Sequence, residues 1–229
     1  IQSAKYKNFD TEVKQIEVIS LPEEYNPLWK HKNTPDFRNA ISYLKGRGVT
    51  IFDILKYRIG YCERGEYSGK IIIPSYDANG SLNYFVARSY YAESKYKHKN
   101  PKISKDIIGF DLTINWAEPI VLCEGAFDAI AIKRNAIPLF GKIIQPQLQK
   151  KIIEKRVKEI YICLDADAIR NALSIAKRFM GEGLNVYFIE LKTEDASDLG
   201  FHRITEIIEE TGVMTFEQQM QLQIEHIWK

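Results

Sequence analysis

The sequence contains few cysteines and no long apolar run. Its 229 residues include three cysteines, Cys62, Cys123 and Cys163, and no two of them form a Cys-x-x-Cys pair. This usage predicts buried, reduced thiols of a cytoplasmic protein and no zinc site in this chain. No apolar run approaches about 18 residues and no signal peptide is visible, so the sequence predicts neither a membrane span nor secretion.

The net charge of the chain is also small, only +2 at pH 7. That charge is unevenly distributed: residues 1–116 carry 18 Lys and Arg against 13 Asp and Glu, whereas residues 117–229 carry 14 against 17. Within the first part, the segment 88–105 holds six basic residues and one acidic residue. A basic excess confined to one segment predicts a local contact with phosphate groups.

Carboxylates directly follow two short apolar runs in the C-terminal half. The run 119–123 is followed by Glu124, and the run 159–164 is followed by Asp165 and Asp167. Such runs are typical of strands buried on both faces of a parallel sheet, and ligands bind at the carboxyl edge of open α/β sheets. The three carboxylates are therefore expected to form a hard-oxygen cluster suited to Mg²⁺ or Mn²⁺.

Strand and helix patterns alternate regularly after residue 117. Strands are expected at 120–123, 137–140, 159–164 and 185–191, with helices at 126–135, 145–157, 169–180, 201–210 and 215–228. Strand–helix units with short connections predict a parallel sheet with right-handed crossovers.

The N-terminal half mixes both kinds of element. A short strand is expected at 16–19, a helix from Asp36 to Leu44, a second helix after Thr50, strands at 70–76 and 82–88, and a loop at 89–105. Thr50 predicts a helix N-cap, and Asn79-Gly80 is typical of a hairpin turn. The whole sequence thus predicts an α/β protein. Its expected parts are a basic, mixed α+β subdomain at 1–116, a Rossmann-like, mainly parallel subdomain at 117–200 and C-terminal helices at 201–229.

The acidic strand ends resemble the Toprim domain. Its pattern is a Glu-Gly strand end, an Asp-x-Asp strand end and a later acidic stretch, which match Glu124-Gly125, Asp165 to Asp167 and Glu194 to Asp198 here. Toprim domains occur in DnaG-type primases, topoisomerases, OLD-family nucleases and small recombination or RNA-maturation proteins. The resemblance therefore implies a metal site, but it does not select one reaction among these classes.

The N-terminal half favours one member of this group, because it resembles the catalytic core of DnaG-type DNA primases. The similar pieces are Tyr43 to Thr50, Ile59 to Tyr61, the hairpin with its Asp77 to Gly80 turn and terminal Arg88, Lys95-Tyr96 with Asn100-Pro101, and Ile108 to Phe110. With the acidic motifs, the resemblance covers about residues 40–200. The stretch Asp195 to Asp198 is closer to the type seen in phage primase-helicases than to the Asp-Pro-Asp of many bacterial members.

The resemblance implies DNA-dependent synthesis of short RNA primers from NTPs on single-stranded DNA, by divalent-metal phosphoryl transfer. It also implies a partner, either a replicative helicase or a separate zinc-binding module, and a cytoplasmic location, which is the host cytoplasm if a phage encodes the protein. A Toprim endonuclease or RNA-processing nuclease and a non-catalytic single-strand binding module are the alternatives. A topoisomerase is disfavoured, because the chain has no room for strand-gating domains.

Individual residues receive roles from the same resemblance. Asp165 and Asp167, with Asp195, are expected to bind one to several metal ions, and Glu124 either completes the ligand set or accepts a proton. Asp128 either joins the metal site or complements the positive start of its helix.

Basic residues are expected to meet nucleotide phosphates or template. Arg47, Arg88 and Lys95 match the basic residues of the family, and its second lysine corresponds to Lys102 or Lys105. Tyrosines of the basic segment are expected to stack on unpaired bases, with at least one packing on the hairpin instead.

Overall fold

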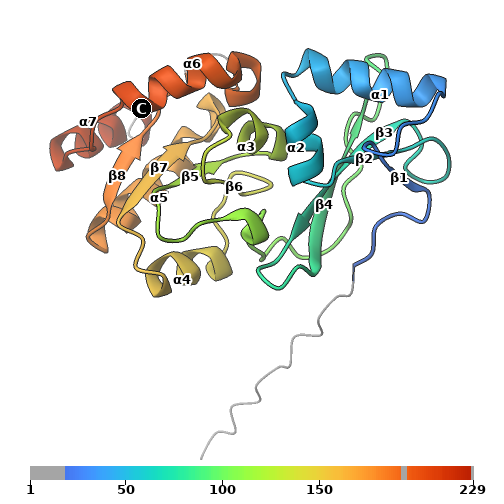
Figure 1. Ribbon diagram of the computed structural model, residues 1–229. Helices are drawn as coiled ribbons and strands as arrows, with labels where there is room; N and C mark the ends of the chain where they lie inside the picture. The colour runs from blue at the N-terminus through green and yellow to red at the C-terminus, as the bar shows by residue number, and fades with distance from the viewer. Residues whose placement is uncertain (1–18, 192–194, 228–229) are drawn as a thin grey trace, which may run out of the picture.

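Two four-stranded sheets stand side by side in the computed structural model, which describes residues 19–191 and 195–227 (Figure 1). The antiparallel sheet has the order β1-β2-β3-β4 and the parallel sheet the order β6-β5-β7-β8. The strands are β1 Tyr25–Pro27, β2 Gly60–Cys62, β3 Lys70–Tyr76, β4 Leu82–Ser89, β5 Ile120–Cys123, β6 Ala136–Pro138, β7 Glu159–Cys163 and β8 Asn185–Phe188. The predicted α/β class, with a parallel sheet in the C-terminal half, is confirmed.

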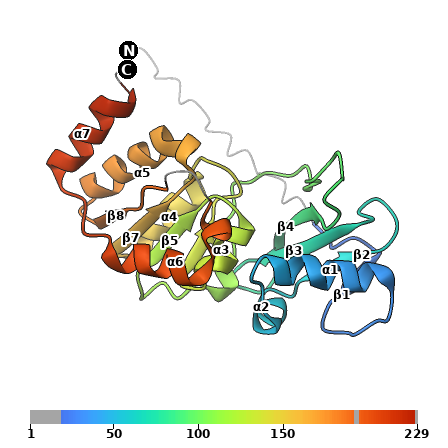
Figure 2. The same ribbon diagram turned by 90° about the horizontal axis from the view of Figure 1, so that it is seen from above.

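Helices cover both faces of the parallel sheet (Figures 1 and 2). The helices are α1 Pro35–Gly46, α2 Ile51–Lys56, α3 Ala126–Ile132, α4 Pro146–Glu154, α5 Ile169–Gly181, α6 Ala196–Glu210 and α7 Phe216–Ile227, with 3-10 turns η1 Asp111–Thr113 and η2 Ala166–Ala168. Successive residues of β5 point to opposite faces. Cys123 therefore packs in the cluster that contains residues of α3 and α6, and Leu122 in the cluster that contains residues of α4 and α5. Every helix in the described ranges is too short or too polar to span a bilayer.

Local sequence signals account for the elements of the N-terminal half. Thr50 caps α2 as predicted: its hydroxyl accepts from the Asp53 backbone N–H, and the Asp53 carboxylate accepts from the Thr50 N–H at 2.8 Å. The β3–β4 hairpin turns through Gly80, whose φ of 82° favours glycine. Asp77 stabilises that turn by accepting from the backbone N–H groups of Asn79 and Ser81, both at 2.9 Å.

One hydrophobic core crosses the junction between the two sheets. The ring of Phe140, after β6, lies 4.7 Å from that of Tyr84 in β4 and 6.2 Å from that of Phe110. Lys133, just after α3, also donates to the buried Asp53 carboxylate of α2 over 3.1 Å. These contacts fix the position of the two sheets relative to each other. The division into 1–116, 117–200 and 201–229 stays a prediction.

Several element ends differ from the expected ones where the backbone takes a positive φ. Helix α3 ends at Ile132 rather than at residue 135, because Lys133 adopts a φ of 55°. The chain also breaks helical geometry inside α6 at Gly200, whose φ is 72°, so a first turn at 196–199 precedes the predicted helix at 201–210. The strand expected at 16–19 lies outside the described residues except for Ile19.

Candidate metal and nucleotide site

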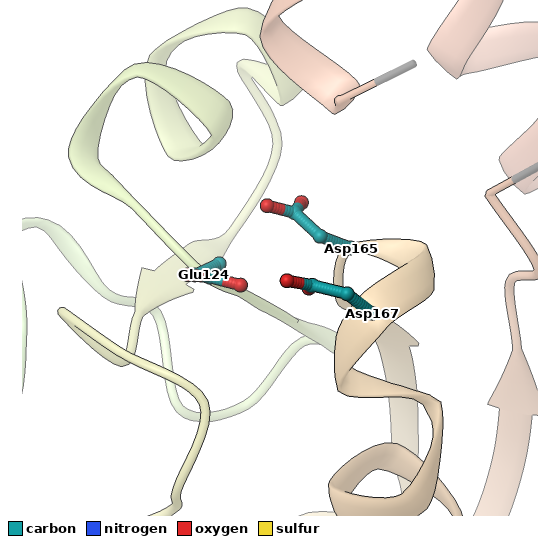
Figure 3. A group of neighbouring side chains, drawn as sticks. All are labelled: Glu124, Asp165 and Asp167. Atoms are coloured by element: carbon teal, nitrogen blue, oxygen red, sulfur yellow. The ribbon is translucent and has the colours of Figure 1, made fainter. Parts of the chain in front are cut away.

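Three carboxylates meet at the carboxyl edge of the parallel sheet (Figure 3). Glu124 follows β5, and Asp165 and Asp167 follow β7, its neighbour in the sheet. One oxygen of each carboxylate lies within 4.8 Å of the other two. Asp167 lies in the 3-10 turn η2, which directly follows Asp165. This arrangement matches the oxygen ligands that Mg²⁺ and Mn²⁺ prefer.

The cluster is electrostatically strained without a cation. Burial, and then the charge of Glu124, raises the pKa of Asp165 to about 7. Burial likewise raises the pKa of Glu124, and the nearby charge of Lys142 opposes that shift. Glu124 Oε2 is buried and has no hydrogen-bond partner among the residues that the structure describes. A divalent ion would satisfy this oxygen and relieve the repulsion between the carboxylates, so the residues present fit such an ion.

The raised pKa of Asp165 predicts that metal-free stability falls with rising pH, whereas metal binding strengthens. Burial raises the pKa of Asp165 in the folded chain to about 7 from its ordinary value of 3.8, so between those values the folded chain holds more protons than the unfolded chain. The metal-free stability should therefore fall as pH rises through this window. Metal binding requires the ionised carboxylate, so Mn²⁺ should raise the melting temperature more at about pH 8 than at about pH 5.5.

Thermal unfolding with and without Mn²⁺ at the two pH values measures both effects. Asp165→Asn is the control, because it removes the titrating group and should flatten both pH dependences. An equal or larger Mn²⁺ effect at the lower pH would contradict the assignment of Asp165 to a metal site.

A cleft of about 400 Å³ opens beside the carboxylates and lies between the two halves of the chain. The charged residues lining it are Glu124, Asp128, Asp165 and Asp195 on one side of the junction and Arg47, Arg88 and Lys105 on the other. The structure thus places together most of the acidic and basic residues that the sequence singled out. Of the described residues proposed for phosphate contact, Lys95 and Lys102 do not line this cleft.

Arg47 is held in the cleft wall by aromatic rings from both halves. Its guanidinium carbon lies 5.5 Å from the ring centre of Tyr43 in α1 and 5.0 Å from that of Phe127 in α3. Its Nη1 also lies 3.4 Å from Ser197 Oγ and 3.9 Å from Asp198 Oδ1. Cation–π contacts of this kind orient the planar guanidinium without neutralising it. Arg47 therefore presents a positive charge to the cleft.

Arg88 and Lys105 approach from the end of β4 and the loop that follows it. The Arg88 guanidinium contacts His98 Nε2, and burial followed by the charge of Arg88 lowers the pKa of His98, which favours a neutral imidazole acceptor. Asn100 Oδ1 accepts from the Ala87 backbone N–H at 3.1 Å and anchors the loop to the strand. Lys105 Nζ donates to the Phe140 carbonyl at 2.6 Å, which ties this loop to the parallel sheet.

Both carboxylate oxygens of Asp128 accept backbone hydrogen bonds, one from the turn after Glu124 and one from the start of α6. Its Oδ2 accepts from the Gly125 N–H at 2.9 Å, and its Oδ1 accepts from the Ser197 N–H at 3.0 Å. The turn after Glu124 and the start of α6 are thereby fixed to each other. Asp195 stands at the N-cap of α6 and lines the cleft, outside the three-carboxylate cluster. Glu194 lies outside the described residues.

Sequence patterns did not point to two residues that contact the site, His98 and Lys142. Lys142 forms an ion pair with Asp167 although 25 residues separate them. A contact between residues so far apart in sequence depends on the path of the loop in the folded chain. The residues around Lys142 show no periodic pattern or motif that would predict it. His98 sits in the basic segment, where an imidazole among lysines was a detectable but unspecific sign of a polar contact.

Comparisons with known proteins agree with the geometry. No protein-family model matches the chain. Uncharacterized protein MG010 of Mycoplasma genitalium is 31% identical over 189 residues, which cover 76% of this chain and 85% of that protein. A DNA primase of Thermotoga maritima is 23% identical over 189 residues, covering 62% of this chain and 34% of the primase. The chain thus spans about a third of the length of that primase.

Among solved structures, the DnaG primase catalytic domain bound to ssDNA matches with a TM-score of 0.69 at 18% identity. The match covers 84% of this chain and 77% of that one. This likeness shows the fold: the antiparallel sheet, the parallel sheet and the C-terminal helices together form the architecture of DnaG primase catalytic cores, as the sequence predicted.

Proposed function

The chain belongs to the family of the Mycoplasma genitalium protein MG010 and has the fold of DnaG primase catalytic cores, and from this premise we propose that it is a primase-type nucleotidyltransferase. The proposed reaction is the synthesis of short RNA primers from NTPs on a single-stranded DNA template. The observation that carries this proposal is a single cleft in which carboxylates of the parallel sheet face cations of the other half. A polymerase needs carboxylates to hold its metal ion, and it needs cations to bind the anionic triphosphate beside that ion.

The carboxylates are the proposed ligands of Mg²⁺ or Mn²⁺. Glu124, Asp165 and Asp167 would hold the ion, and Asp195 supplies a further oxygen from the start of α6. When bound, such an ion supplies positive charge to the transferring phosphoryl group and lowers the pKa of the attacking 3′-hydroxyl. Asp128 acts beside them as a positioning residue, since both its oxygens accept backbone N–H groups of the neighbouring turns.

The cations across the cleft are the proposed binding groups for the triphosphate. Arg47 and Arg88 offer planar guanidinium groups, which suit two-pronged contacts with phosphate oxygens. Lys105 adds a point charge near Phe140, at the end of the parallel sheet. Because these three residues come from the N-terminal half and the ligands from the C-terminal half, binding of an NTP depends on the junction between them.

The basic segment 88–105 is the proposed contact with the template. Tyr96 is 70% exposed and Tyr91 is 45% exposed, so both rings are accessible to unpaired bases. Tyr90 is buried and donates to Asp36 of α1 at 2.7 Å, so its ring is not available to unpaired bases. Lys95 and Lys102 are exposed on the same segment and are proposed to contact template phosphates rather than the triphosphate.

Reversing the charge of this segment should weaken template binding. The double substitution Lys95→Glu and Lys97→Glu is expected to lower affinity for single-stranded DNA by about tenfold or more at moderate salt. The slope of log affinity against log salt should fall by about one to two units, because two phosphate contacts are lost.

Fluorescence anisotropy over a salt series measures this slope. The matched control is Lys150→Glu with Lys177→Glu, two exposed lysines on α4 and α5. An unchanged affinity and slope in the first variant would show that the segment is only a solvated surface.

A replicative helicase or a separate zinc-binding module is the proposed partner. The matched part is 34% of the length of the Thermotoga maritima primase, and this proposed partner concerns functions outside the matched part. The cytoplasm is the proposed location, as for the replication machinery that the chain would serve.

The proposed activity is tested by incubating the chain with labelled NTPs, single-stranded DNA and Mn²⁺ or Mg²⁺. Template-dependent oligonucleotides are the expected product. A parallel reaction without NTPs measures cleavage of the DNA or of RNA. Cleavage without incorporation would replace the primase proposal by the nuclease alternative, and a chain that binds DNA without either reaction would be a binding module.

A further inference from the structure

Arg47 stands at the end of α1, where regular helix geometry no longer directs its side chain. Helix α1 ends at Gly46, and Arg47 is its C-cap residue, with a φ of −97° and a ψ of 14°. The Arg47 side chain is only 26% exposed. A guanidinium that is largely withdrawn from water needs protein contacts in its place, and those contacts set the direction of its plane. They therefore decide how Arg47 faces the cleft.

The polar contacts of Arg47 are too long to fix that plane. Its Nη1 lies 3.4 Å from Ser197 Oγ and 3.9 Å from Asp198 Oδ1, whereas strong hydrogen bonds from a guanidinium to a carboxylate are about 2.7–2.9 Å long. The Asp198 side chain is also 58% exposed, so water screens its charge. Asp198 consequently neither neutralises Arg47 nor holds it in one orientation.

The aromatic contacts of Arg47 lie within the effective range of a cation and a ring face, and the shorter one is with Phe127. The guanidinium carbon lies 5.0 Å from the ring centre of Phe127 and 5.5 Å from that of Tyr43, both inside the range of roughly 6 Å for this attraction. The two rings meet edge to face, with centres 6.1 Å apart and planes at 80°. Phe127 thus supports both the guanidinium and the other ring that flanks it.

The ring of Phe127 belongs to the same turn as a carboxylate of the metal cluster. Phe127 lies in the first turn of α3, which directly follows Glu124 and Gly125. The next residue, Asp128, accepts from the backbone N–H groups of Gly125 and Ser197 and fixes this turn to the start of α6. The position of the ring is therefore coupled to the position of Glu124.

We propose that Phe127 is a positioning residue for the triphosphate, because its ring holds the Arg47 guanidinium toward the cleft and links it to the turn that carries Glu124. This inference rests on the triphosphate site of the proposed function and refines it. Phe127 acts through Arg47 and not on the nucleotide itself. Its loss should therefore weaken nucleotide binding and leave the metal site unchanged.

Nucleotide affinity of the whole chain, loaded with Mn²⁺, tests this role. Isothermal titration calorimetry with a non-hydrolysable NTP analogue should show binding about fivefold weaker in Phe127→Leu, which keeps an apolar side chain but loses the ring. Phe127→Met should behave in the same way, and Phe127→Tyr, which keeps a ring, should stay within about twofold of the wild type. The affinity for Mn²⁺ alone should not change. In the incorporation assay, the Michaelis constant for NTP should rise while kcat stays close to that of the wild type.

A double-mutant cycle shows whether Phe127 acts through Arg47. In an Arg47→Ala background, Phe127→Leu should cause no further loss of affinity, because the guanidinium that the ring positions is absent. In an Arg88→Ala background, the two losses should add, because Arg88 contributes to the cleft independently of the ring.

The orientation of Arg47 is also measurable without nucleotide or metal. The rings of Phe127 and Tyr43 should displace the nuclear magnetic resonance signal of the Arg47 Nε–H group, which is assigned by its absence from Arg47→Ala. Phe127→Leu should move this signal toward the position of exposed arginines. Phe127→Tyr should leave it near the wild-type position.

The matched control is Phe201→Leu, because the Phe201 ring of α6 lies 5.7 Å from Lys133 Nζ and does not line the cleft. It removes a ring beside a cation and should leave nucleotide affinity unchanged. An equal loss of affinity in this control would show a general effect of ring removal and overturn the inference.

Failure of this inference differs from failure of the proposed function. If Arg47→Ala weakens nucleotide binding and neither Phe127→Leu nor Phe127→Met does, the inference is overturned while the triphosphate site stands. A further loss on adding Phe127→Leu to Arg47→Ala also overturns it. If Arg47→Ala itself binds the nucleotide as the wild type does, the triphosphate site of the proposed function fails together with this inference.

Discussion

Asp165→Asn is expected to reduce template-dependent nucleotide incorporation by roughly a thousandfold or more. The substitution keeps the shape of the side chain but removes a charge from the centre of the proposed ligand set, where Glu124 and Asp167 lie within 4.8 Å. The metal-free protein should become more stable at about pH 8, because a carboxylate whose pKa is raised to about 7 by burial no longer has to ionise. Lost activity with gained stability identifies a functional residue.

Initial rates of labelled NTP incorporation and thermal unfolding measure the two effects. The matched control is Glu159→Gln, at the opposite end of the same strand β7, where the carboxylate accepts from the Tyr187 hydroxyl at 3.1 Å. This variant should keep full activity. Full activity in Asp165→Asn as well would remove the carboxylate cluster from the reaction.

Arg47→Ala and Arg88→Ala are each expected to reduce incorporation by about a hundredfold while leaving Mn²⁺ affinity within about twofold of the wild type. Both guanidinium groups line the cleft but belong to the opposite half from the metal ligands. Their proposed contact is the triphosphate, so the Michaelis constant for NTP should rise and the pH optimum should not move. The charge of neither residue is needed to hold the ion.

Arg38→Ala is the control for loss of an arginine in the same half. Arg38 lies in α1, and its guanidinium donates to Asn33 Oδ1 at 2.7 Å outside the cleft. It should behave as the wild type in incorporation and in metal binding. If Arg47→Ala and Arg88→Ala also retain normal incorporation, the cleft does not bind the triphosphate.

The acidic cluster was predictable because each of its strand ends is marked by a few adjacent residues in the sequence. An apolar run buried on both faces ends where charged residues begin, so the sequence marks the carboxyl end of each strand of a parallel sheet. Glu124 and Asp165 follow such runs, and their strands pair directly in the structure. The N-cap at Thr50 and the hairpin turn at Gly80 were predictable for the same reason, since each depends on the chemistry of a few adjacent residues.

The walls of the cleft were only partly predictable, because they depend on contacts between distant segments. Arg47 faces the cleft since it packs between Tyr43 and Phe127, which lie on different sides of the junction. Lys142 reaches Asp167 through the path of a loop after β6. Positive φ values at Lys133 and Phe140 redirect the chain, and neither residue type favours that conformation by itself. Packing determines these features.

The central claim is that the carboxylates and the cations form one site in which a metal ion and a triphosphate meet. Pulsed electron paramagnetic resonance of Mn²⁺ bound to the whole chain, with a non-hydrolysable NTP analogue, measures the ³¹P coupling between the ion and the phosphates. We predict a coupling typical of direct contact in the wild type and in Arg38→Ala, and its loss in Arg88→Ala at the same occupancy by Mn²⁺. Saturating nucleotide binding to the Mn²⁺-loaded wild type without any ³¹P coupling would contradict the account.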